Sequence, residues 1–83
     1  MKARVLVRLK PGILDVQGTS VKRALEGLGF GEVRELRVGK VLDLEVEAPD
    51  AARARRRVEE MCARLLANPV TEDFDVRVLE AAR

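Results

Sequence analysis

The chain contains no histidine, tryptophan or tyrosine, and it has only one cysteine and two phenylalanines. Without histidine, it cannot form the Ser-His-Asp or Cys-His arrangements of hydrolases, or a zinc site with histidine ligands. A single cysteine cannot close an intrachain disulfide, and two phenylalanines are too few for the platforms on which RNA-binding domains stack bases. We therefore expect no catalytic residue, no bound cofactor and no metal in this chain.

The chain also lacks a large excess of either basic or acidic residues. Sixteen basic residues are balanced by 14 acidic ones, which leaves a net charge of +2 and makes no nucleic-acid footprint. The arginine run at Arg53 and 55–57 is followed at once by Glu59 and Glu60, a pattern typical of a solvated helix face. No run approaches the roughly 18 apolar residues of a membrane span, and no signal peptide opens the chain. We expect a cytoplasmic protein that binds neither nucleic acid nor membranes.

The length of 83 residues fits one domain, residues 1–83. A chain this short buries only about 60–65% of its unfolded surface, so its core is thin and association with other chains is a common remedy. Cys62 falls on the apolar face of an expected helix, where a thiol behaves as a small hydrophobe.

The first half of the chain predicts a strand, a loop and a helix. Residues 3–10 alternate between apolar and charged side chains, as a strand with one buried face does. Pro11-Gly12 ends the strand, and Asp15 is a good N-cap for a helix over residues 16–28. Gly18 in the first turn of that helix indicates either a close approach of another backbone or ligand, or plain tolerance near a helix end.

The second half predicts two strands, a second helix and a last strand. Residues 32–38 and 40–47 alternate around Gly39, which is suited to a hairpin turn, with either a two-residue loop or a longer or bulged one. Asp50 caps a helix over residues 51–67, and Asn68 before a proline is suited to a left-handed cap at its end. Residues 74–79 alternate again and predict the final strand.

This order, β-α-β-β-α-β, predicts an α+β fold of ferredoxin-like outline, with an antiparallel sheet and both helices on one face. The opposite face carries Leu6 among charged residues and has no cover of its own. We therefore expect a dimer, or a dimer of dimers, packed through sheets or edge strands.

The amino-acid sequences of several segments resemble those of a known family. The matching pieces, in order, are Leu9-Lys10-Pro11-Gly12-Ile13-Leu14-Asp15 with Gln17-Gly18, Ala24-Leu25, Leu28-Gly29-Phe30, Val38-Gly39-Lys40, Met61-Cys62, and Leu65-Leu66-Ala67-Asn68-Pro69-Val70 with Glu72. They resemble the PurS family, the small subunits of formylglycinamidine ribonucleotide synthase in purine biosynthesis. One departure is Val16, where the family usually has proline after the aspartate.

The resemblance implies a bridging role without catalysis. PurS proteins are dimers that join a large ATP-using synthetase subunit, PurL, to a glutaminase subunit, PurQ, so that ammonia from glutamine reaches the synthetase. The ATP and magnesium belong to the large subunit. On this reading, eight residues are candidate contacts to the partners: Lys10, Asp15, Gln17, Gly18, Gly39, Lys40, Asn68 and Glu72.

Other interpretations stay open at this point. Gly18, Gly39 and Asn68 could serve backbone geometry alone, and Asp15 could serve only as a cap. An ACT-like module that binds amino acids at a dimer interface has the same order of elements, with Gly12 and Gly18 in its binding loop. An RNA-binding α+β domain is disfavoured because the aromatic pair on the central strands is missing.

Overall fold

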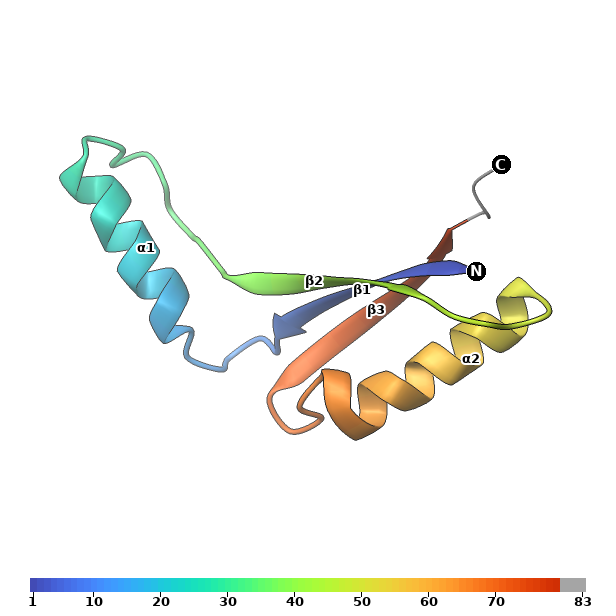
Figure 1. Cartoon of the computed structure of the whole chain (residues 1–83). Helices are drawn as coiled ribbons and strands as arrows, with labels where there is room; N and C mark the ends of the chain where they lie inside the picture. Colours follow the sequence, from blue (N-terminus) through green and yellow to red (C-terminus); the bar gives the residue numbers. More distant parts are fainter. Residues whose placement is uncertain (80–83) are drawn as a thin grey trace.

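The computed structural model describes residues 1–79 and consists of a small sheet, one helix packed on it, and one helix held away from it (Figure 1). In chain order the elements are β1 (Lys2–Leu9), α1 (Val16–Gly27), β2 (Gly39–Glu45), α2 (Ala51–Met61), a short π-helical turn (Cys62–Leu66) and β3 (Glu72–Leu79). The α+β class with an antiparallel sheet is confirmed.

The sheet has three strands in the order β2-β1-β3, and both pairings are antiparallel. Val5 at the centre lies opposite Leu42 of β2 and Val76 of β3. The alternation of β1 places Ala3, Val5 and Val7 on one face, where they are almost completely buried. We call this the inner face, and the face carrying Leu6 the outer face.

Helix α2 covers the inner face. Asp50 caps it by accepting a hydrogen bond from the Arg53 amide at 2.8 Å, as the sequence predicts. Val58 and Cys62 are fully buried against the sheet, so Cys62 is the small buried hydrophobe that was expected. The α-helix ends at Met61, and its last turn to Leu66 widens into a π-helix.

Helix α1 and residues 28–38, together called the arm, project from one end of the sheet and make no extensive contact with any strand or with α2 (Figure 1). The described chain is accordingly elongated, 50 × 32 × 14 Å, with a radius of gyration of 16.2 Å. A compact chain of this length has a radius of gyration of about 12 Å. The prediction that both helices cover one sheet face is wrong for this chain, since only α2 does so.

The predicted strand over residues 32–38 is not formed, and the predicted hairpin at Gly39 is absent. Gly39 has no left-handed φ and is the first residue of β2, so residues 33–45 run on in one direction instead of turning back. Without the turn, residues 32–38 have no neighbouring strand among residues 1–79.

A second correction concerns Asn68. Among residues 1–79, only Gly12 and Gly29 have positive φ, so Asn68 is not a left-handed cap. Its side-chain oxygen instead accepts the Val70 amide at 3.0 Å, which makes a local turn. Gly29, with φ +99°, ends α1 as a glycine beyond a helix C-terminus commonly does.

The outer face has no helix. Leu6 is half-buried there beside Val41, which is 57% exposed, and Arg4 pairs with Asp43 at 2.7 Å. Within residues 1–79 no helix has both the length and the apolar composition needed to cross a bilayer.

Candidate partner-binding site

The eight candidate contact residues, which lie far apart in the sequence, come together at one end of the sheet. The register places Arg8 opposite Gly39 and Leu9 opposite Glu72, so the end of β1 adjoins the starts of β2 and β3. Lys40 follows Gly39 in β2, and Gln17 and Gly18 are in the first turn of α1. The loops that carry Lys10, Asp15 and Asn68 leave from this same end of the sheet (Figure 1). We call the junction between sheet and arm the neck; it consists of residues 10–15 and of the last three residues of the arm, 36–38.

Asp15 holds the neck together. One carboxylate oxygen accepts the Gly18 amide at 2.7 Å, which caps α1, and the other accepts the Val38 amide at 2.7 Å. The residue is 92% buried, and these two N–H groups hold the pKa of its carboxyl below the ordinary value, with a smaller contribution from nearby Arg37. Asp15 therefore fixes the start of the helix against the segment that leads back to β2.

Gly18 is required by this arrangement. A Cβ at this position would lie 2.5 Å from the Asp15 carboxylate and 2.7 Å from the Leu36 carbonyl oxygen. The close approach of another backbone, one of the two readings of Gly18 from the sequence, is confirmed. Gly39 is similar, since a Cβ there would lie 2.6 Å from the Val7 carbonyl oxygen.

Arg37 connects the two segments of the neck, and it was not among the candidate residues from the sequence. Its guanidinium donates to the carbonyl oxygens of Lys10 at 3.2 Å, Ile13 at 3.3 Å and Leu9 at 3.5 Å. No sequence signal identifies it, because the alternation in residues 32–38 presents it as one more charged strand residue.

Beside the neck, the inner face carries an open depression of about 380 Å³ that includes five of the candidates. Lys40 and Gln17 are exposed there, and Leu14 and Val16 present apolar surface with exposed fractions of 75% and 67%. Its lining residues are Val7, Arg8, Leu9, Leu14, Asp15, Val16, Gln17, Val38, Gly39, Lys40 and Glu72. Exposed apolar side chains with polar residues around them suit contact with another protein surface.

Glu72 lines the depression at the start of β3, and Asn68 lies in the loop that precedes this strand. The backbone amide of Asn68 donates to a Glu72 carboxylate oxygen at 2.7 Å, and the backbone amide of Lys10 donates to the Thr71 carbonyl oxygen at 2.8 Å. The polar atoms of Asn68 and Glu72 thus hold the loop in shape. The same loop exposes Val70, at 76%, and the π-helical turn before it exposes Leu65, at 84%. Neither residue was among the eight candidate contacts.

The residues that line the site combine exposed apolar and charged side chains. Residues 1–79 contain no group of three or more His, Cys, Asp and Glu side chains placed to hold a metal ion. The charged side chains of Asp15, Arg37 and Glu72 form hydrogen bonds with backbone amides or carbonyl oxygens. None of these hydrogen bonds involves the Lys40 side chain.

Comparisons with known proteins agree on one family. The model of the PurS family, described as phosphoribosylformylglycinamidine (FGAM) synthase, matches residues 2–80. The PurS subunit of Methanocaldococcus jannaschii is 42% identical over 77 residues, which cover 93% of this chain and 93% of that protein. The PurS subunit of Bacillus subtilis is 42% identical over 79 residues, covering 95% and 93%.

Solved structures give the same result. The crystal structure of Methanocaldococcus jannaschii PurS superposes with a TM-score of 0.89 at 40% identity and covers 98% of both chains. A chain in the structure of PurLQS from Thermotoga maritima superposes with a TM-score of 0.85 at 36% identity, covering 94% of this chain and 95% of that one. The family expected from the sequence motifs is confirmed: this chain belongs to the PurS family of FGAM synthase subunits.

Proposed function

We propose that this chain is the bridging subunit of an FGAM synthase, in which it joins a PurL synthetase subunit to a PurQ glutaminase subunit and supplies no catalytic group. The observation that carries the proposal is the match, over 94% of the chain, to a component of the Thermotoga maritima PurLQS structure. On this proposal ATP and magnesium act in the large subunit, and the chain works in the cytoplasm as a homodimer.

We further propose that the sheet end at the neck is the surface that meets the larger subunits. The eight candidates gather there, together with Leu14 and Val16, which a lone chain leaves in water. Lys10 and Lys40 are the informative members, because the four ion pairs found in residues 1–79 include neither of them. A charge that the fold does not use is free to serve a partner.

Co-purification tests the bridging role. The chain is mixed with candidate synthetase and glutaminase subunits in the presence of glutamine and ATP, and glutamine-dependent amidine formation is measured. We expect a complex of all three proteins and activity only when this chain is present. Amidine formation at the same rate without it, or glutaminase or ATPase activity of the chain alone, would contradict the proposal.

Charge reversal tests the surface. Lys10→Glu and Lys40→Glu are each expected to weaken assembly about tenfold or more while leaving thermal stability nearly unchanged. Lys2→Glu is the control, because Lys2 is exposed, as Lys40 is, but lies at the opposite end of β1. Assembly unaffected by both neck variants, or weakened equally by the control, would place the contact elsewhere.

A further inference from the structure

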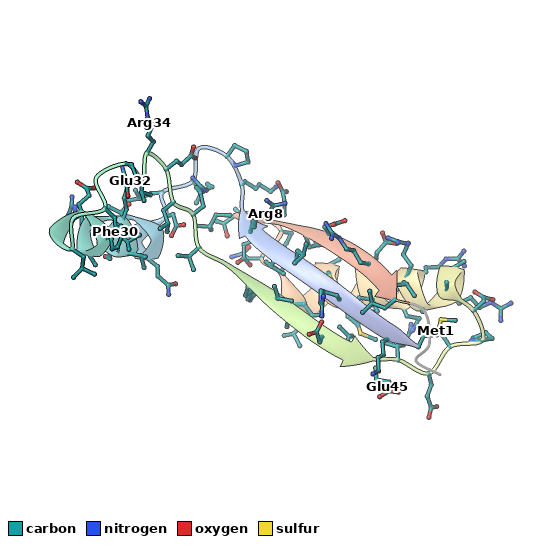
Figure 2. All side chains as sticks on the ribbon, turned by 90° about the horizontal axis from the view of Figure 1, so that it is seen from above. Met1, Arg8, Phe30, Glu32, Arg34 and Glu45 are labelled. Atoms are coloured by element: carbon teal, nitrogen blue, oxygen red, sulfur yellow. The ribbon has the colours of Figure 1, made fainter. Side chains whose placement is uncertain are left out.

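The two edges of the sheet differ in what lies beside them. β2 and β3 are the edge strands, because β1 lies between them. An edge strand carries a row of backbone N–H and C=O groups that can pair with a strand of another molecule. Figure 2 views the outer face and shows α2 behind the sheet, where it contacts β3 and β1. Within residues 1–79, β2 has no extensive contact with either helix.

The register of the β1–β3 pairing determines which groups of β3 point outward. The backbone amide of Lys10 donates to the Thr71 carbonyl oxygen at 2.8 Å, in continuation of that register. Hydrogen-bonded and non-hydrogen-bonded pairs alternate along an antiparallel ladder. Counting from Thr71, the backbone groups of Phe74, Val76 and Val78 point away from β1. These three residues are therefore the ones that a further strand would pair with.

Arg55 of α2 occupies the middle of this row. Its guanidinium donates to the Val76 carbonyl oxygen at 2.6 Å. The helix that carries it is fixed on the inner face, because Ala54 and Val58 are fully buried. A strand that approaches the β3 edge must displace this guanidinium before it can pair with Val76.

The β3 edge would be able to pair with itself if it were open. β3 is eight residues long, Glu72–Leu79, and contains neither glycine nor proline. When two copies of β3 lie antiparallel with Val76 opposite Val76, Asp75 of each copy lies opposite Arg77 of the other. Oppositely charged residues that face each other across two strands stabilise the pairing. A bare β3 edge would thus attract a second copy of the chain.

The other arginines of α2 that form polar contacts within residues 1–79 do so inside the helix. Arg53 pairs with Asp50 at 3.8 Å, and Arg57 pairs with Glu60 at 3.1 Å. Arg55 instead reaches the sheet, although its side chain is not part of the buried core. Since the buried side chains already hold α2 in place, the bond to β3 has a separate effect at the edge.

We infer that Arg55 closes the β3 edge of the sheet and so prevents this strand from pairing with β3 of a second copy. The carbonyl group at the centre of the edge has a partner within its own chain, and edge strands of soluble proteins are commonly protected by such cover. The inference goes beyond the bridging function, because it concerns an association that the fold excludes.

Substitution of Arg55 tests the closure on the whole chain. Arg55→Met removes the guanidinium and keeps a long side chain, and Arg56→Met is the matched control. Arg56 is exposed on the same helix, and the hydrogen bonds and ion pairs found in residues 1–79 do not include its side chain.

Sedimentation velocity at high micromolar concentration measures the fraction of protein in species larger than those of the natural chain. This fraction is expected to rise about tenfold or more in Arg55→Met and to stay unchanged in Arg56→Met. An equal distribution of species in both variants, with both folded by circular dichroism, would overturn the inference and leave Arg55 as a fastening of α2 alone.

Disulfide trapping locates the new contact. In the Arg55→Met background, one chain carries Asp75→Cys and a differently tagged chain carries Arg77→Cys, and the two are mixed and oxidised. The mixed disulfide is expected to form about tenfold faster than with Arg55 in place, and faster than when Val41→Cys on β2 replaces Arg77→Cys. Cys62 is fully buried, and the chain without added cysteines measures its background. Larger species without the 75–77 link would overturn pairing through β3.

The natural chain provides a readout that does not depend on the folding of a variant. A fluorescent peptide with the sequence of residues 72–79 serves as a probe for an open β3 edge, and fluorescence anisotropy measures its binding. The natural chain is expected to bind the peptide at least about tenfold more weakly than Arg55→Met does. Micromolar binding by the natural chain, competed by unlabelled peptide and lost in the presence of Val76→Pro in β3, would show that the edge is open and would overturn the inference.

Discussion

At the scale of the residue, Asp15 links three parts of the chain. The sequence predicts its role as the cap of α1, because that role depends on residues only three positions away. Its bond to the Val38 amide could not be predicted, since it spans 23 residues and depends on the path of the arm. The same distinction holds for Arg37, whose three carbonyl partners lie 24 to 28 residues away.

The first prediction concerns pH. Because folding lowers the pKa of Asp15 from its ordinary value of 3.8, the carboxylate stabilises the native state above that pH, and the stabilisation is lost as pH falls through the lower native pKa. Asp15→Asn is therefore expected to flatten the acid dependence of unfolding below about pH 5. Urea unfolding across this range measures it.

Asp43→Asn is a useful comparison, because the Arg4 guanidinium also lowers the pKa of Asp43. Each variant should remove only its own share of the acid dependence. An acid dependence in Asp15→Asn identical to that of the natural chain would show that the carboxylate does not hold the neck.

The second prediction compares two glycines of α1. Gly18→Ala is expected to destabilise the chain by about 1–3 kcal/mol, because the new methyl group meets Asp15 and the Leu36 carbonyl oxygen. Gly27→Ala meets nothing within 4 Å and should stabilise by roughly 0.5–1 kcal/mol through helix propensity. Thermal unfolding measures both, and equal effects would contradict the close approach.

The third prediction concerns Cys62. Burial, with a smaller effect of the Glu59 carboxylate, raises the pKa of its thiol, so the reactive thiolate is scarce and shielded. A thiol reagent at pH 8 is expected to modify Cys62 only as fast as the chain unfolds, and rapidly in denaturant. Fast modification of the native chain would show that the core beneath α2 is open.

At the scale of the element, the sequence predicts each segment best where its partner lies in the same chain. The alternation of β1 and β3 and the apolar face of α2 identify their buried residues, because these elements pack on one another. Residues 32–38 show strand alternation without forming a strand, since nothing in one chain pairs with them. The π-helical turn after Met61 has no signal in the apolar pattern, which continues to Leu66.

The fourth prediction tests the core under α2. Val58 is fully buried against the sheet, and Val58→Ala is expected to cost about 2–3 kcal/mol in the free energy of unfolding. Val41→Ala on the outer face removes the same atoms from a side chain that is 57% exposed, and it should stay within about 0.5 kcal/mol. Denaturant unfolding compares them. Similar costs would mean that the outer face is buried in a dimer.

At the scale of the whole molecule, a single chain leaves its arm without a packing partner. Composition predicts a thin core that needs association, and the elongated arm gives this need a physical form. The prediction of a dimer, or a dimer of dimers, packed through sheets or edge strands is not tested by a single chain. The uncovered arm could not be predicted from the linear pattern, because residues 32–38 were read as part of a hairpin.

The fifth prediction follows at this scale. If dimerisation completes the fold, the unfolding temperature of the natural chain rises with protein concentration, by several degrees between low and high micromolar solutions. Leu36→Asp in the arm should abolish this dependence without unfolding the sheet, because Leu36 lies outside the core of residues 1–79. Differential scanning calorimetry over a dilution series measures it, and a constant midpoint for the natural chain would contradict it.

The strand order has a consequence for biosynthesis. β1, which leaves the ribosome first, is the central strand, and one of its two neighbours is β3, which leaves last. Val5 and Val7 therefore remain without the β3 side of their sheet until β3 has been translated. Folding of the sheet is expected to wait for β3, and a ribosome stalled before β3 would carry a nascent chain with these valines exposed to chaperones.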